Sequence, residues 1–356
     1  MDSKLNSEDY ILKIDKHKIY DLLFDFPEQI MWGIKIFTEE EIELASHTNL
    51  QNIVICGMGG SAISGDILKD CSRDELEIPI FVNREHKIPK FVNEKTLLIA
   101  ISYSGNTYET LEMLEEGISR GATVAGITSG GKMKDMLENL SKPIFIVPPG
   151  LPPRHALGFL FTILYLIISK IFRLDTLNRL KNLADFLRNI RNGFIINKVH
   201  GNLPKAIAGE MFNALPFLYS DSRYFSAVVK RWKTQMNENA KHLVAYDLFP
   251  ELTHNEIVGW EFPPDIHTVV LLLRDIKEDL NIAYSIDTTK KLFNANELIE
   301  IITEGEDLLE RIFYLIYLGD FTSFYLAILK GIDPYEIKSI DKLKEELKLK
   351  IKKEEK

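Results

Sequence analysis

The sequence has few of the residues that mark disulfide-bonded, metal-binding or nucleic-acid-binding proteins. Cys56 and Cys71 are the only cysteines in 356 residues and form no C-x-x-C pair, so we expect neither a disulfide framework nor a zinc site. Lysine and arginine (43) are outnumbered by aspartate and glutamate (52), giving a formal charge of −9. Nucleic acid requires a basic face, so we expect no such partner.

We also expect neither a membrane-spanning segment nor a signal peptide. The stretch that most resembles a membrane segment, 156–169, is too short to span a bilayer and predicts a buried helix. The first ten residues, "MDSKLNSEDY", are polar and acidic. With the scarcity of cysteine, this predicts a cytoplasmic protein that has no membrane partner.

Short apolar runs alternate with helical patterns along the chain, which is typical of an α/β fold with parallel sheets. The first half predicts one doubly wound domain with strands at 52–56, 78–82, 96–101, 123–128 and 143–147. A helical stretch is expected at 156–192. The second half is less regular, with strands expected at 216–220, 268–274 and 298–303, and long helices at 224–246 and 306–330.

Two loops rich in glycine and serine each follow an expected strand and open an expected helix. They are "GMGGSAISGD" (57–66) and "SYSGNT" (102–107). Backbone N–H groups and hydroxyls at a helix start hold a phosphate without needing a lysine. Either loop alone is equally well explained by ordinary helix capping. Two of them on neighbouring strands favour a phosphate site.

The first loop also fits a dinucleotide. Gly57, Gly59 and Ala62 match the G-x-G-x-x-A pattern, and Arg84 at the end of the next strand could serve a 2′-phosphate. However, Asn83 stands where a ribose-binding acid would be expected, and a dinucleotide fold has no use for the second loop. An NADP-dependent oxidoreductase therefore remains as an alternative.

Both loops resemble those of the sugar isomerase (SIS) domain, the phosphosugar-binding fold of the phosphoglucose isomerase superfamily. From about residue 26 to 334 the chain more closely resembles the bifunctional phosphoglucose/phosphomannose isomerases. It carries, in family order, "FPEQI", "PPGLPPRHALG", "QMNENAKHLVAY", "HNEIVGW" and "YLGDFTSFYLAILKGIDP". The resemblance implies two SIS-like doubly wound α/β domains with flanking helices. It also implies a metal-independent, cofactor-free isomerase that acts on hexose 6-phosphates through an enediol.

The same resemblance assigns roles to residues that pattern alone would leave unremarkable. Glu238, on pattern a surface glutamate near Lys241, would be the base that moves the carbon proton. His254 would open the sugar ring and would reach the site from the other subunit of a homodimer. Arg154, which follows "PPGLPP", would stabilise the enediolate.

Further residues would bind substrate or assist ring opening. By resemblance, five residues would bind substrate, the last three of them chiefly its phosphate: Gly60, Ser61, Ser102, Ser104 and Thr107. The C-terminal "IDKLKEEL" would bring a lysine, Lys344 in preference to Lys342. The preceding "DPYEI" departs from the usual "DPTPV", and a plain amphipathic tail is the competing interpretation.

We expect five segments. They are an N-terminal helical part (1–45), a first SIS domain (46–155), a helical connection (156–195), a second SIS-like domain (196–333) and a C-terminal helix (334–356). A non-catalytic sugar-phosphate sensor is a second function compatible with such domains. Sensors usually carry a basic helix-turn-helix, and the sequence contains no such pattern.

Overall fold

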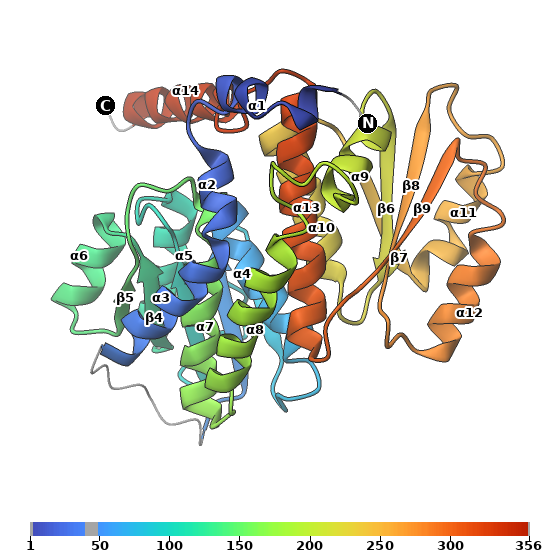
Figure 1. Cartoon of the computed structure of the whole chain (residues 1–356). Helices are drawn as coiled ribbons and strands as arrows, with labels where there is room; N and C mark the ends of the chain where they lie inside the picture. Colours follow the sequence, from blue (N-terminus) through green and yellow to red (C-terminus); the bar gives the residue numbers. More distant parts are fainter. Residues whose placement is uncertain (1–2, 40–48, 355–356) are drawn as a thin grey trace.

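The computed structural model describes residues 3–39 and 49–354. The expected boundary between the first two segments, at 45/46, lies outside these ranges. The described chain forms two parallel sheets with helices between them and on both outer sides (Figure 1). The predicted α/β class with two doubly wound sheets is confirmed.

The first sheet has five parallel strands in the order β2-β1-β3-β4-β5. They are β1 (Asn52–Gly57), β2 (Ile80–Asn83), β3 (Thr96–Ile101), β4 (Thr123–Thr128) and β5 (Ile144–Ile146). Every residue of β3 is buried, as expected for a strand covered on both faces. One face packs on α3 (Phe26–Glu39), α4 (Gly59–Cys71) and α7 (Leu157–Phe172), and the other on α5 (Tyr108–Ser119) and α6 (Gly131–Asn139).

The second sheet has four parallel strands in the order β7-β6-β8-β9. They are β6 (Leu215–Asp221), β7 (Ala245–Phe249), β8 (Thr268–Arg274) and β9 (Glu297–Ile302). Its inner face packs on α9 (Leu203–Met211), α10 (Ser226–Ala240) and α13 (Leu308–Leu329). Its outer face carries η3 (Glu251–His254), α11 (Glu256–Gly259) and α12 (Leu280–Thr289).

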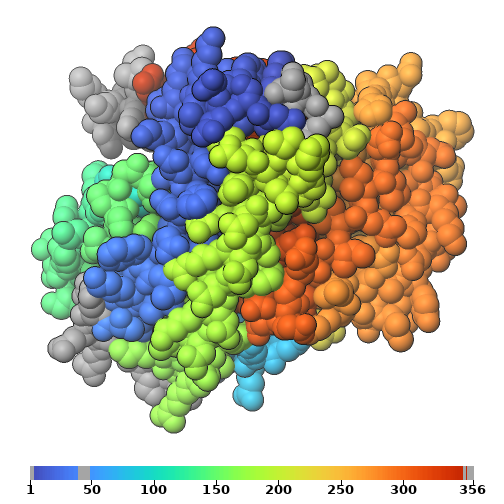
Figure 2. Space-filling model, in the orientation of Figure 1, coloured from blue at the N-terminus to red at the C-terminus, as the bar shows by residue number. Residues whose placement is uncertain are grey.

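A layer of helices fills the space between the sheets and forms one continuous core. The remaining elements are η1 (Ser3–Asn6), α1 (Glu8–Ile14), α2 (Ile19–Phe24), η2 (Pro153–His155), α8 (Leu177–Arg191) and α14 (Lys338–Glu354). The N-terminal helices and α8 lie side by side across one face (Figures 1 and 2). There the Arg188 guanidinium binds the Glu28 carboxylate at 2.5 Å.

The expected strands are all present within two residues at their ends, but β7 was not predicted. The helix expected over 224–246 ends at Ala240, because Lys241 adopts a left-handed conformation (φ 49°) and the His242 N–H donates to the Met236 carbonyl at 3.1 Å. A lysine in place of the usual glycine hid this stop. The stretch expected to be helical over 156–192 is divided into α7 and α8 at Arg173, which is also left-handed.

Within the described residues, α13 is long and apolar enough to cross a membrane, but its most apolar stretch is wholly buried in the protein. It contacts α8, α9 and α10. Helices at the centre of large cores have this composition as well. The shorter apolar helix α7 is likewise buried along almost its whole length, as predicted.

A buried carboxylate joins the two halves of the protein. Asp70, near the end of α4, accepts hydrogen bonds from the Ala227 N–H (2.7 Å) and the Ser226 hydroxyl (2.9 Å) in the first turn of α10. It thereby satisfies an N–H group that the helix cannot pair internally. Burial raises the pKa of Asp70 to about 6 despite these bonds.

This carboxyl should make the stability of the protein depend on pH. Because its folded-state pKa lies above its unfolded value, the folded state binds the proton more tightly, and Asp70's contribution to the free energy of unfolding falls as pH rises from about 4 to about 6. The change is at most about 3 kcal/mol. Urea unfolding of wild type and Asp70→Asn at pH 4.5 and 6.5 measures it as a difference between the two proteins. Identical pH dependence in both would contradict this assignment.

Candidate active site

The loops at the carboxyl edge of the first sheet are tied to one another. The Tyr103 N–H donates to the Ser61 hydroxyl (3.2 Å), which joins the loop after β3 to the start of α4. The Tyr103 hydroxyl donates to the Pro148 carbonyl (2.7 Å) and accepts from the Leu151 N–H (2.9 Å). Tyr103 therefore holds the proline-rich loop against the other two. Ligands of open α/β sheets bind at this edge.

The predicted phosphate loop, 102–107, is compact and close to its neighbours. The Ser102 hydroxyl donates to the Thr107 hydroxyl (3.0 Å), and the Asn106 N–H donates to the Ser104 hydroxyl (3.3 Å). Gly105 has a φ of +65°, and a Cβ there would lie 1.7 Å from the Gly130 carbonyl oxygen, so only glycine fits. The loop opens α5, whose N-terminus attracts an anion.

Arg84, the residue that kept a dinucleotide possible, is engaged elsewhere. Its guanidinium pairs with Asp66 and donates to the Ala62 carbonyl (3.2 Å), both in α4. Asp66 also binds the Lys230 ammonium at 3.1 Å. Arg84 therefore joins the end of β2 to α4.

The loop geometry leads to a prediction about substrate affinity. Ser104→Ala with Thr107→Ala removes two hydroxyls that would hold substrate and transition state alike. We expect KM to rise with little change in kcat, because a uniform loss of binding appears in KM. Steady-state kinetics of the double variant, beside Ser119→Ala at the other end of α5 as a control, measure the effect. A collapse of kcat at constant KM would instead give the loop a part in the chemistry.

Arg154 and Glu238 are brought together from opposite halves of the chain. Arg154 lies in η2, beyond the proline-rich loop, with 3% of its side chain exposed, and its Nη1 lies 3.5 Å from Oε2 of Glu238 near the end of α10. Glu238 is 25% exposed, so its carboxylate remains accessible. Burial lowers the pKa of Arg154, and the charge of Glu238 opposes that change. The Glu238–Lys241 pairing that the sequence suggested is replaced by bonds from Lys241 Nζ to the Asn239 (3.2 Å) and Asp333 (3.1 Å) carbonyls.

Gly60 connects this pair to the phosphate loop. A Cβ on Gly60 would lie 2.9 Å from both Cα and N of Arg154, so the backbones touch. Ser61 follows directly and is bonded to Tyr103. Contacts thus link seven of the predicted site residues into one cluster: Gly60, Ser61, Ser102, Ser104, Thr107, Arg154 and Glu238.

No described hydrogen bond or ion pair within the chain joins the other three predicted residues to this cluster. His254 ends η3 on the far side of the second sheet and is exposed. Lys342 and Lys344 lie on the exposed helix α14, where Lys342 pairs with Glu346 at 3.9 Å. Arg154 Nη2 donates to the carbonyls of Pro334 and Tyr335, so the segment that leads into α14 lies beside the site.

Residues that hold Arg154 were not predicted. Its Nε donates to Asn239 Oδ1 (2.7 Å), and its Nη2 donates to the carbonyls of Pro334 and Tyr335 (2.9 Å each). Its own carbonyl accepts from Arg231 Nη2 (3.1 Å). Arg231 in turn binds both oxygens of Asp320 (3.0 and 2.6 Å). A sequence signal did exist, because Asp320 is a lone charge in the middle of an apolar helix, and such a charge needs a partner.

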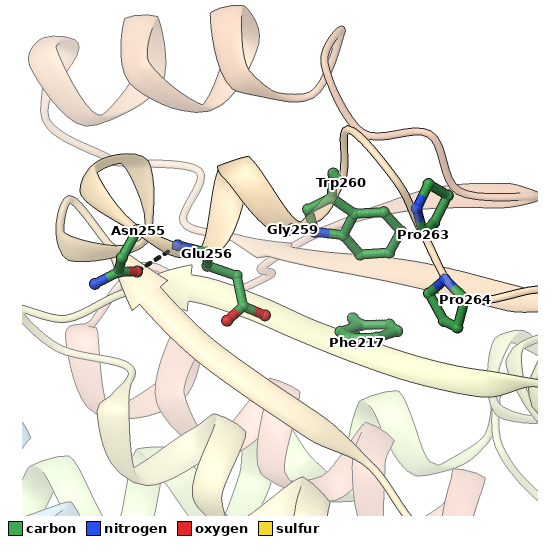
Figure 3. A pocket seen from close by; sticks show the side chains of 7 residues that line it. All are labelled: Phe217, Asn255, Glu256, Gly259, Trp260, Pro263 and Pro264. Atoms are coloured by element: carbon green, nitrogen blue, oxygen red, sulfur yellow. Dashed lines mark hydrogen bonds between the residues drawn. The ribbon is translucent and has the colours of Figure 1, made fainter.

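The described residues contain no group of three or more histidine, cysteine, aspartate or glutamate side chains placed to hold a metal ion. A separate pocket lies on the outer side of the second sheet (Figure 3). Phe217 and Trp260 form its apolar part, with ring centroids 4.8 Å apart. Glu256, beside it, accepts from the Tyr219 hydroxyl at 2.8 Å. No predicted site residue lines this pocket, although His254 directly precedes its Asn255.

Comparison with known proteins places the chain in a family. Over 335 residues it is 35% identical to a bifunctional phosphoglucose/phosphomannose isomerase of Caldicellulosiruptor bescii, covering 92% of this chain and 98% of that protein. The chain belongs to the bifunctional phosphoglucose/phosphomannose isomerase family. Three further relatives, 35–36% identical, carry the same name. The profile "Bacterial phospho-glucose isomerase C-terminal SIS domain" matches residues 200–347.

Two other proteins, which carry different names, are also similar to this chain. A D-glucosamine-6-phosphate 4-epimerase of Sulfolobus acidocaldarius is 27% identical over 314 residues, covering 87% of this chain and 94% of that protein. A hypothetical protein of Thermus thermophilus has the same fold, with a TM-score of 0.76 at 14% identity over 97% of this chain and 94% of the other. The resemblance of the sequence to the isomerase family is therefore confirmed. The roles of single residues stay predictions.

Proposed function

We propose that this chain interconverts glucose 6-phosphate and fructose 6-phosphate, and mannose 6-phosphate and fructose 6-phosphate, without a metal ion. The observation that carries the proposal is the Arg154–Glu238 pair, 3.5 Å apart beside the phosphate loop. A carboxylate and a fixed cation are the two groups that proton transfer through an enediolate requires. Family membership supports the same reaction.

The chemistry follows from where charge develops. With the phosphate held at 102–107, Glu238 would take the proton from C2 of the open-chain aldose and return it to C1, while the hydroxyl proton passes from O2 to O1. The two sugars are epimers at C2, so both lose that proton to a common enediol and one base serves both. Arg154 would stabilise the enediolate oxygen with Nη1, which bears no closer partner than Glu238 among the described residues.

A coupled assay on glucose 6-phosphate and mannose 6-phosphate, in EDTA, tests the proposal directly. Turnover of both sugars without added metal is the expected result. Glucosamine 6-phosphate is the third substrate to include, because one relative is named as an epimerase of that sugar. Activity on glucosamine 6-phosphate alone would overturn the proposal, as would activity that EDTA abolishes and a divalent ion restores. Binding without turnover of any sugar would favour a sensor.

We further propose that the protein is a cytoplasmic homodimer in which His254 acts in the site of the other subunit. His254 is exposed, and three apolar side chains that follow it in the sequence are exposed as well: Val258 (60%), Phe262 (90%) and Ile266 (53%). Exposed apolar side chains favour a protein partner, and a second copy of the chain is the partner that would also complete the site. For ring opening we retain Lys344 of α14 in preference to Lys342, because Lys344 fits the Leu-Lys pattern of the family.

Complementation tests the shared site. Glu238→Gln and His254→Ala proteins should each be inactive, and mixing them should restore activity once subunits exchange. About half of the dimers are then hybrids with one intact site each, so about a quarter of wild-type activity should return. Co-purification of differently tagged chains is the control for exchange. Exchange without recovered activity would show that both residues serve the same chain's site.

A further inference from the structure

Two of the three guanidinium nitrogens of Arg154 are held by close hydrogen bonds, and the third is not. Its Nε and Nη2 bind Asn239 and the carbonyls of Pro334 and Tyr335 at 2.7–2.9 Å. Nη1 has only the longer contact to Glu238, at 3.5 Å, among the described residues. The geometry therefore directs one nitrogen of a buried cation toward the predicted base. This orientation is useful only if the main chain of Arg154 stays in place.

Arg231 is the side chain that holds that main chain. Its Nη2 donates to the Arg154 carbonyl (3.1 Å), and its Nε and Nη2 bind Asp320 in bidentate fashion. Arg231 and Asp320 are each 2% exposed. Asp320 pairs with Arg231 and not with Arg154. The positive charge of Arg154 therefore remains available to a substrate.

A stabilising role alone explains this pair poorly. Replacement of a buried ion pair by apolar residues of similar volume is often neutral or stabilising. An apolar pair could join α10 to α13 equally well, but it could not donate a hydrogen bond to the Arg154 carbonyl. The bond from Arg231 to Arg154 is the feature that requires an arginine here.

We propose that Arg231, oriented by Asp320, is a positioning residue of the isomerase reaction. It acts through the main chain of Arg154 and keeps Nη1 facing the site. The inference rests on the proposed function. Loss of Arg231 should move the Arg154 guanidinium away from the enediolate, whose charge it would stabilise in the transition state. The phosphate loop should not change. The effect should therefore fall on kcat and spare KM.

Two variants separate positioning from stability. Arg231→Lys keeps the charge beside Asp320, but one ammonium cannot bind both carboxylate oxygens and the Arg154 carbonyl in the same geometry. Arg231→Met with Asp320→Leu removes both charges and fills the space. The matched control is Arg311→Lys, since Arg311 pairs with buried Asp275 at 2.7 Å and makes no described contact with Arg154.

For both test variants we expect kcat to fall roughly 10-fold or more, with KM within about twofold of wild type. The melting temperature of the double variant should stay near that of wild type, while Arg311→Lys should lose stability without losing kcat. A folded double variant with wild-type kcat would overturn the proposal. If the double variant does not fold, Arg231→Lys decides, and unchanged kcat in it overturns the proposal. Wild-type protein that is inactive on both hexose phosphates would overturn the proposed function itself.

Discussion

Glu238→Gln should lower kcat on both hexose phosphates by roughly 10²–10⁴, the usual contribution of a positioned base. Glutamine keeps the size of the side chain and its ability to accept a bond from Arg154, but it cannot take up the carbon proton. KM should change little, because the phosphate loop does not contact this side chain through any described bond. Initial rates over a range of substrate concentrations separate the two constants.

The control for this variant is Glu210→Gln, the same chemical change at an exposed position on α9. It should retain wild-type kcat. Isotope exchange at C2 gives a second readout, since Glu238→Gln should lose exchange of the C2 proton with solvent along with isomerisation. A kcat within about threefold of wild type would exclude Glu238 as the base.

Arg154→Lys should lower kcat on the order of 10²–10³-fold, comparable to removing one donor that stabilises a developing oxyanion. Lysine retains a charge but cannot reproduce the planar arrangement in which Nε and Nη2 are bound while Nη1 faces Glu238. The loss should again lie in kcat, because the enediolate charge exists only beyond the ground state.

Stability needs its own control here, because Arg154 bonds to Asn239 and to two carbonyls that would lose a partner. Arg188→Lys is suitable, since Arg188 binds Glu28 and Asp185 on the outside of the molecule. Thermal unfolding of both variants, beside their kinetics, distinguishes lost chemistry from lost structure. An Arg154→Lys enzyme with unchanged kcat would remove Arg154 from the mechanism.

The first sheet could be predicted almost completely from the sequence, because its buried strands are short apolar runs separated by turn residues. The second sheet was harder. Its edge strand β7 contains exposed Tyr246 and begins shortly after α10 ends, and the helical pattern of the sequence continues through Lys241. Helix termination without glycine depends on the backbone conformation of one residue, which composition does not reveal.

The site was predictable where a loop motif carried the signal and unpredictable where single polar residues did. Ser102, Ser104 and Thr107 could be found from their spacing beside Gly105. Asn239 and Arg231 could not, because their partners are 77 to 89 residues away in the sequence. The lone charge of Asp320 in an apolar helix indicates that a partner is needed, but it does not say which residue that partner is. Such contacts exist only once α10, α13 and η2 have packed together.

The position of α13 also matters while the chain is being made. This helix fills the centre of the core, yet in the chain it follows the described strands of both sheets. At roughly 5–20 residues per second, the ribosome needs on the order of ten seconds to pass from the end of α10 to the end of α13. During that interval the apolar faces of α9 and α10 that α13 later covers are exposed on the nascent chain. Chaperone capture should therefore be most needed between the synthesis of α10 and that of α13, after the described strands of the first sheet have been made.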